Sequence, residues 1–447
     1  MSRLRPISHP VALVVIAARL LAPVDGLRAQ ATATHETDGV LTRTRAALAH
    51  FSDACARDGA APWGRSLCGP VLALDYDAGR VLANQHDSAG TLAMRDGVWQ
   101  APLPRDLPRA NTAVAWGGTR WATVIAPLPD DDFGALALLA HESFHRLQPA
   151  LGLTGPDVLS PHLDERDGRL WLRMELRALA YALTSSGAIA KEHARTALRF
   201  RTERQRLFPG SASREDALER MEGSAEYTGM RLALTLGTMG PLRVVRAMDG
   251  VERNASFVRS FAYGTGPALG LLLDRWSPGW HRRFVQGASM AALLRAAIGE
   301  RAGAVDALAR PYGYAAVLAF EDDRAQRRMA TITRYRERLV AGRRLIFPAD
   351  DVNRSFDPNE LVPLDSSGTI YPTGTFQGPW GTLEVTDGAL LSADFRRLVV
   401  SAPESLAPTD GAATRLKGNG WTLELREGWV IVPAPGALAG NLEVRRR

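Results

Sequence analysis

One helix-forming stretch decides the fold: residues 130–148 read DDDFGALALLAHESFHRLQ. The three aspartates at its start supply N-cap oxygens and negative charge where a helix dipole favours them. Apolar side chains then recur at helical spacing and form one stripe that can face a core. They are Phe133, Leu136, Ala137, Ala140, Phe144 and Leu147. We expect a helix over 131–148, with His141 and His145 about 100° around from the middle of the stripe.

The end of this helix carries a metal-binding pattern, because His141-Glu142-Ser143-Phe144-His145 is an H-E-x-x-H sequence. Histidines four residues apart lie one above the other on a helix, so both imidazoles can reach one ion. The structural alternative is a core helix whose two histidines are satisfied by hydrogen bonds.

A hydrolytic metal site needs a third protein ligand and one open coordination position. Leu151 stands where a third histidine would be required, so we expect a glutamate from a second helix. Glu222 is favoured because the small residues 223–225 let its helix approach the histidine helix closely. Glu226, one turn further on, can accept the remaining ring N–H of a ligating histidine.

Glu175 is the reserve ligand. It lies in an apolar helix between Arg173 and Arg177, where ion pairing can explain it without a metal. The corresponding alternative for Glu222 and Glu226 is a solvated helix face. The sequence favours Glu222 and leaves both readings open.

Three side chains are candidates for stabilising a developing oxyanion: Tyr227, Tyr263 and, as a third possibility, His162. No spacing argument selects among them, and an ordinary buried tyrosine is the alternative for each of the two tyrosines. Thr112–Trp116 and Thr119–Ile125 flank Gly117-Gly118 and predict a β-hairpin. The second strand runs into the metal helix, so its edge can bind an extended peptide, or the strand can simply cover the helix.

The H-E-x-x-H sequence followed by Glu222-Gly223-Ser224-Ala225-Glu226-Tyr227 resembles the gluzincin branch of the zincin metallopeptidases. It is similar in particular to small bacterial peptidase-MA-like proteins, over roughly residues 119–236. The resemblance implies an α+β, zincin-like domain in which a small β-sheet precedes a mainly helical region. It also implies one Zn²⁺ ion, with His141, His145 and Glu222 as ligands and Glu142 as general base.

The implied function is a zinc-dependent peptidase that acts on a peptide or protein substrate. Glu226 stands where an aspartate commonly follows the third ligand in the thermolysin pattern, so its longer side chain departs from that pattern. Two other functions stay open: a catalytically inactive binding or structural protein on the same scaffold, and a zinc hydrolase with a non-peptide substrate. Glu142 favours an enzyme, because a purely structural histidine pair does not need it.

Composition and the N-terminal residues indicate the class of protein and its compartment. With 46% hydrophobic and 23% charged residues among 447, the chain is globular, neither disordered nor collagen-like. Residues 1–31 hold four arginines and one aspartate, and so half of the net charge of +6. No dense basic run with interleaved aromatics follows, so nucleic-acid binding is not expected. Residues 1–31 predict a signal peptide cleaved after Ala29-Gln30-Ala31, hence a secreted or periplasmic protein with no later membrane span.

The rest of the chain divides by composition. In an oxidising compartment, Cys55 and Cys68 are expected to form a disulfide. We expect a zincin-like domain over 32–346, with strands in 70–127 and helices in 130–346. A connector rich in Pro, Asp, Asn and Ser follows at 347–368, and a small β-rich domain occupies 369–447.

Overall fold

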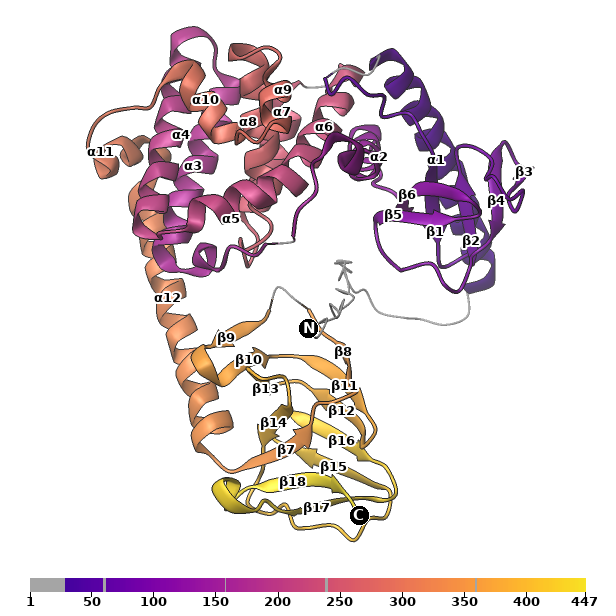
Figure 1. Ribbon diagram of the computed structural model, residues 1–447, viewed down its shortest axis with the longest axis vertical. Helices are drawn as coiled ribbons and strands as arrows, with labels where there is room; N and C mark the ends of the chain where they lie inside the picture. Colours follow the sequence, from indigo (N-terminus) through magenta and orange to yellow (C-terminus); the bar gives the residue numbers. More distant parts are fainter. Residues whose placement is uncertain (1–28, 59–61, 157, 238–239, 358–359) are drawn as a thin grey trace, which may run out of the picture. The chain divides into compact units, whose positions relative to one another are not determined.

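The computed structural model describes residues 29–58, 62–156, 158–237, 240–357 and 360–447. The chain divides into two compact units, Met1–Val317 and Leu318–Arg447. The first unit joins a β-sheet to a set of helices, and the second is built mainly of strands (Figure 1). The fold is therefore mixed α and β with a C-terminal β region, as the sequence predicts at this level.

The first unit contains a six-stranded sheet with the order β3-β4-β2-β1-β6-β5. Its strands are β1 (Val71–Asp75), β2 (Arg80–Ala83), β3 (Ala93–Arg95), β4 (Val98–Pro102), β5 (Thr112–Trp116) and β6 (Thr119–Ile125). The hairpin around Gly117-Gly118 forms with the predicted bounds, and both glycines adopt positive φ angles. Alternate residues of the strands, among them Leu72 and Trp121, form one apolar cluster on a face of this sheet.

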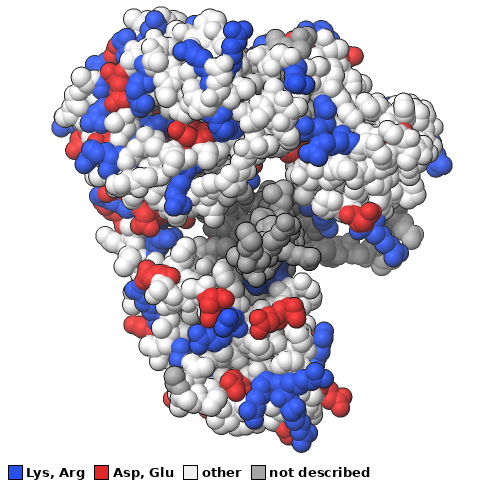
Figure 2. All heavy atoms as spheres, in the orientation of Figure 1, with Lys and Arg blue, Asp and Glu red and all other residues white. Residues whose placement is uncertain are grey.

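Helices make up the rest of this unit, and most lie where the sequence predicts them. They are α1 (Ala29–Asp58), α2 (Asp132–Leu147), α3 (Arg166–Thr184), α4 (Gly187–Leu207), α5 (Ser211–Leu218), α6 (Ser224–Ala233), α7 (Pro241–Glu252), α8 (Ala262–Trp276), α9 (Trp280–Val285), α10 (Met290–Ile298) and α11 (Val305–Ala309). Helix α12 (Tyr314–Arg336) begins in this unit and belongs for most of its length to the second. On the face shown in Figure 2, basic and acidic side chains are interspersed over these helices.

Helix α2 packs against the sheet on one side and against α6 on another. Its N-cap is Asp131, whose carboxylate accepts a hydrogen bond from the backbone N–H of Gly134 at 3.0 Å. The predicted apolar stripe is buried, but so are His141, Glu142 and Ser143. The helix is thus enclosed on most of its surface, where the sequence predicts a helix with one buried side and one side facing a cleft.

The helix expected to carry Glu222 and Glu226 is in fact interrupted. After α5, residues Glu219–Gly223 form a π-helical segment, called the π-turn below, before α6 begins at Ser224. Widened turns of this kind occur frequently at functional sites. The interruption lies at the residues that the sequence singled out, because Glu222 is within the π-turn.

Two glycines let helices approach closely, though not as predicted. A Cβ at Gly229 would lie 2.4 Å from the carbonyl oxygen of Ala137, so it is Gly229 that allows α6 to contact α2. Gly223, expected to face the histidine helix, instead faces α8, where a Cβ would lie 3.2 Å from the Cα of Gly266. The π-turn accounts for the difference, because it changes which side of the helix each residue faces.

The second unit contains a seven-stranded sheet and a five-stranded sheet. Their strands are β7 (Arg344–Pro348), β8 (Asn353–Ser355), β9 (Val362–Leu364), β10 (Gly368–Tyr371), β11 (Gly374–Gly378), β12 (Gly381–Val385), β13 (Ala389–Ser392), β14 (Arg397–Ser401), β15 (Thr414–Gly418), β16 (Trp421–Leu425), β17 (Trp429–Pro433) and β18 (Leu442–Arg446). Side chains from both sheets, including Phe347, Trp380 and Trp421, share one core cluster.

The predicted connector at 347–368 is wrong for the parts that form strands, since the end of β7, all of β8 and β9 and the start of β10 fall within it. Strand β7, which includes Phe347, lies between β14 and β18 within the seven-stranded sheet. The polar and Pro-containing part forms β8 and β9, each at one end of its sheet. Edge strands tolerate proline and polar residues since one side makes no ladder hydrogen bonds. Composition alone therefore made an edge of the β-domain look like a linker.

The predicted disulfide between Cys55 and Cys68 is present, with Cα atoms 5.4 Å apart. Its loop carries Trp63, whose ring packs on Phe144 of α2 and whose Nε1 donates to Thr228 of α6 at 2.9 Å. The predicted signal peptide lies outside the described residues except at its end, where α1 begins. Among the helices that the structure describes, none is long and apolar enough to cross a membrane. A disulfide of this kind fits an oxidising compartment.

Candidate metal centre

The two histidines of α2 face the same point. Their Nε2 atoms are 2.9 Å apart, and their rings are nearly perpendicular, with centroids 4.7 Å apart. This is the arrangement that the four-residue spacing predicts for a pair of ligands on one helix. His141 is buried and His145 is partly buried, so a group bound between them is largely shielded from water.

Glu222 of the π-turn completes a triangle with the histidine pair. Its Oε2 lies 3.6 Å from Nε2 of His141 and 3.5 Å from Nε2 of His145. Ligands of a tetrahedral zinc ion, at 2.0–2.1 Å from the metal, are about 3.3 Å from one another. The three atoms are therefore close to the spacing of a metal-ligand set, and this group could hold a metal ion.

The second ring nitrogen of each histidine is held by a side chain, as is usual for metal-binding histidines. Nδ1 of His141 lies 2.8 Å from Oε2 of Glu226, the contact that the sequence predicts. Nδ1 of His145 lies 2.8 Å from Oε1 of Gln148, which the sequence analysis missed. The amide of Gln148 also donates to the carbonyl oxygen of Met221 at 2.7 Å, which ties the end of α2 to the π-turn.

Glu222 is itself held by two donors from the segment around α8. Arg259 donates to its Oε1 at 2.9 Å, and the hydroxyl of Tyr263 donates to its Oε2 at 2.8 Å. The ring of Tyr263 also stacks on the ring of His141. Tyr263, a predicted site residue, is thus at the centre, and Arg259 is an addition that no sequence signal indicated.

The charges around the triangle favour a cation. Burial lowers the pKa of His141, but its hydrogen bonds to the carboxylates of Glu222 and Glu226 outweigh burial and raise this pKa well above its usual value. Burial alone would raise the pKa of Glu222, and the two histidines hold it far below its usual range instead. Carboxylates that favour a proton between these side chains also favour a metal ion in its place.

One of the buried carboxylate oxygens of Glu142, Oε2, has no hydrogen-bond partner, in contrast to those of Glu222. Burial raises the pKa of its carboxyl group, although the nearby histidines oppose the shift. A buried carboxylate oxygen without a partner is costly in a folded protein. A water molecule, or the proton of a reacting group, is what such an atom can accept.

Two predicted residues are engaged elsewhere. The hydroxyl of Tyr227 donates to Asp274 and lies 2.9 Å from Nε2 of His281, away from the histidine pair. Tyr227 follows Glu226 directly and is therefore turned about 100° around α6, toward α8 and α9. His162, the third possibility, bonds with Glu215 at 2.7 Å. The prediction that Tyr227 or His162 stabilises an oxyanion beside the histidine pair is therefore wrong.

Glu175, the reserve ligand, is also placed away from the triangle. Its two carboxylate oxygens accept from Arg201 and Arg204, each at 2.7 Å, in the interior between α3 and α4. The ion-pair reading of this residue is the one that the structure supports. Neither neighbouring arginine of the sequence is involved, because Arg173 and Arg177 turn to Glu252.

Comparison with known proteins gives no match: no protein-family model, no curated protein and no solved structure matches this chain.

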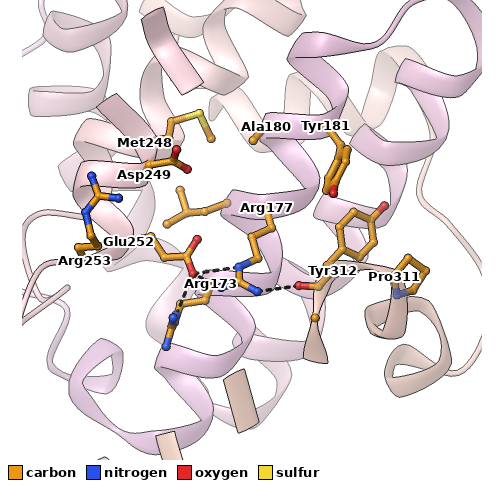
Figure 3. Close-up of a pocket in the computed structure, with 12 residues that line it drawn as sticks. Arg173, Arg177, Ala180, Tyr181, Met248, Asp249, Glu252, Arg253, Pro311 and Tyr312 are labelled. Carbon is orange, nitrogen blue, oxygen red and sulfur yellow. Dashed lines mark hydrogen bonds and ion pairs between the residues drawn. The ribbon is translucent and has the colours of Figure 1, made fainter. Parts of the chain in front are cut away.

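A separate pocket of about 600 Å³ lies between α3, α7 and the segment after α11 (Figure 3). Its lining includes Arg173, Arg177 and Glu252, together with the rings of Tyr181 and Tyr312. Both arginines donate hydrogen bonds to the same carboxylate oxygen of Glu252, Oε1. Arg177 also donates to the carbonyl oxygen of Tyr312 at 2.9 Å. The pocket holds none of the residues of the triangle, and its Arg173, Arg177 and Glu252 pair with one another.

Proposed function

We propose that this protein is a zinc-dependent peptidase. The observation that carries the proposal is the triangle of His141, His145 and Glu222, with the partnerless carboxylate oxygen of Glu142 beside it. Two neutral nitrogen ligands and one carboxylate suit zinc and leave a fourth position open for water. Bound zinc supplies Lewis acidity, which activates water and polarises a carbonyl group.

The chain's own residues support the proton transfers that peptide hydrolysis needs. Glu142 can accept a proton from the attacking water and deliver it to the leaving amine, since its free oxygen is available and burial raises its pKa. Tyr263 keeps its proton, because burial and Glu222 raise its pKa. Its hydroxyl already donates to Glu222, so we assign it to orienting this ligand in place of the oxyanion role expected from the sequence.

The β-sheet offers a way to hold an extended peptide next to α2. The sequence suggested the edge of β6, but β6 is paired on both sides, with β1 and with β5. The end of the sheet is β5, and both β5 and β6 pack against α2. Backbone groups on the outer side of an edge strand can pair with a substrate strand. We therefore transfer the proposed peptide-binding role from Thr119–Ile125 to Thr112–Trp116.

Glu142 also separates the peptidase from a binding or structural protein. It is not one of the three ligand residues, and it is buried with one oxygen unsatisfied. A site that only holds a metal for stability gains nothing from such a group, whereas a hydrolase needs a base at this place. A zinc hydrolase with a non-peptide substrate would share the same residues, and the assay below distinguishes it.

Metal analysis and hydrolysis of a peptide library test the proposal with a matched pair of variants. Glu142→Gln should retain about one zinc per chain and lose hydrolysis by a factor of at least about 10². Glu222→Gln, the same change at a ligand, should lose the zinc as well. A parent protein that binds no zinc would refute the proposal. Stoichiometric zinc without peptide hydrolysis would refute the peptidase and leave the binding protein or a non-peptide hydrolase.

A further inference from the structure

Behind the π-turn lies a network of buried ion pairs that the proposed chemistry does not use. Three carboxylates and two guanidinium groups, each no more than 1% exposed, meet between α3, α4, α5 and the π-turn. They belong to Glu175, Arg201, Arg204, Glu215 and Glu219. Buried charges are costly unless they are paired, so a cluster of this size needs a reason beyond stability alone.

The network ends on the π-turn at Glu219. Arg201 bonds with both carboxylate oxygens of Glu219, at 2.5 and 2.9 Å, and its Nε donates to Glu175 at 2.7 Å. The hydroxyl of Thr265 in α8 also donates to Glu219, at 2.5 Å. Because Arg201 and Thr265 come from two different helices, the Glu219 side chain is held from both sides.

The geometry of the π-turn links the position of the Glu219 side chain to that of Glu222. In an α-helix, residues three apart differ by about 60° in direction, so Glu219 and Glu222 would lie on nearly the same side. A π-helix has about 4.4 residues per turn, which separates the two residues by roughly 115°. Glu219 can then bond with the buried arginine while Glu222 faces His141 and His145.

We propose that Glu219 is a positioning residue of the metal centre: held by Arg201 and Thr265, it maintains the π-turn that directs Glu222 to the histidine pair. The inference rests on the proposed function only in taking Glu222 as a metal ligand. In this role, Glu219 sets the direction of a metal ligand without contacting the metal itself. The alternative is that Glu219 contributes to folding alone, as any buried ion pair does.

The chain offers a matched control for this distinction. Glu215 is equally buried and also binds one guanidinium group with both oxygens, through Arg204 at 2.8 Å. It lies in α5, outside the π-turn. Glu215→Gln and Glu219→Gln therefore remove the same charge from the same network, and only the second acts on the π-turn.

The experiment measures zinc affinity of the full chain, after metal removal, by competition with a chromophoric chelator at a temperature where all variants are folded. Glu219→Gln should raise the Kd for zinc about tenfold, as loss of a group that orients a ligand does, and Glu215→Gln less than about twofold. The visible spectrum of the Co²⁺-loaded protein should change for Glu219→Gln only. Equal affinities and spectra for the parent and Glu219→Gln would overturn the proposal, as would equal losses in both variants.

Thr265→Val covers the case in which Glu219→Gln does not fold, because it keeps the ion pairs and the volume and removes one hydrogen bond to Glu219. We expect its Kd for zinc to rise about threefold, and an unchanged Kd would contradict the proposal. The parent protein separates the two failures. Zinc binding by the parent with no effect of these variants rejects only the positioning role, whereas a parent that binds no zinc rejects the proposed function with it.

Discussion

Adding one methyl group at Gly229 should push α6, which directly follows the π-turn of Glu222, away from α2, which carries both histidines. A Cβ at this position would lie 2.4 Å from the carbonyl oxygen of Ala137 and 3.4 Å from the Cβ of His141. Close carbon–oxygen contacts in proteins are about 3.3–3.6 Å, so α6 must move by about 1 Å from α2. The obstacle is backbone, which cannot rotate away as a side chain can.

The expected effect has two parts. Overpacking of this kind costs about 1–3 kcal/mol, and replacing glycine by alanine within a helix returns about 0.5–1 kcal/mol, so the net loss of stability is about 1–2 kcal/mol. Gly229 follows Glu226 within α6, and Glu222 lies in the π-turn just before α6. Both glutamates contact His141. Because metal–ligand distances tolerate only about ±0.2 Å, a shift near 1 Å should raise the Kd for zinc at least about tenfold.

The assay combines chemical denaturation of the metal-free protein with a zinc competition titration. Gly250→Ala is the control, since Gly250 lies within α7 and a Cβ there meets nothing within 4 Å. This variant should gain about 0.5–1 kcal/mol and bind zinc as the parent does. A Gly229→Ala protein that binds zinc as tightly as the parent would refute the reasoning that the α2–α6 spacing sets the ligand geometry.

Two further changes test the electrostatics of the same region. Tyr263→Phe removes the hydrogen bond to Glu222 but keeps the ring stacked on His141. The Kd for zinc should therefore rise about tenfold, while the unfolding midpoint changes little. An unchanged Kd in the competition assay would contradict the orienting role of Tyr263. Burial and neighbouring acidic side chains raise the pKa of Asp216 to about 6, so ionisation destabilises the fold as the pH rises through this value. Asp216→Asn should therefore raise the free energy of unfolding by about 1–2 kcal/mol at pH 8 and leave it unchanged at pH 4, and equal effects at both pH values in urea denaturation would count against this cause.

Local geometry explains which parts of the site could be predicted. His141 and His145 share a face because the α-helical period is set by the backbone, and the aspartates and apolar stripe around them indicate that helix strongly. Glu226 was placed by the same period, one turn after Glu222. The relation between the histidines needs only the chain within one helix, and the structure has it as predicted. The contact of Glu226 with His141 is also present, but it joins α6 to α2.

The remaining site residues carry no local signal. Gln148 follows the helix as an ordinary C-terminal residue, and Arg259 lies just before α8 among residues that do not suggest a function. Tyr227 and Tyr263 could not be separated from the sequence, because the choice depends on which way each ring faces in the packed helices. Only the approach of α8 to the π-turn brings Tyr263 to Glu222 and leaves Tyr227 with Asp274.

The strands show in the same way which features a local sequence pattern predicts and which depend on distant segments. The hairpin of β5 and β6 was predicted to the residue, since two glycines with positive φ angles between alternating runs define such a turn. Which of the two strands is the edge depends on β1, far earlier in the chain, pairing in parallel with β6. The polar residues of 347–368 likewise suggested a connector until the sheets placed β8 and β9 at their edges.

By itself, the sequence determined the helix with its two histidines, the glutamate between them, the disulfide and the tight hairpin, because each depends on backbone periodicity or on residue types close along the chain. Tertiary structure alone decided that Glu222, and not Glu175, joins the histidines. That choice depends on a π-turn stabilised by buried charges from three helices. The direction of a side chain in such a turn is set by packing between distant segments, which no local pattern records.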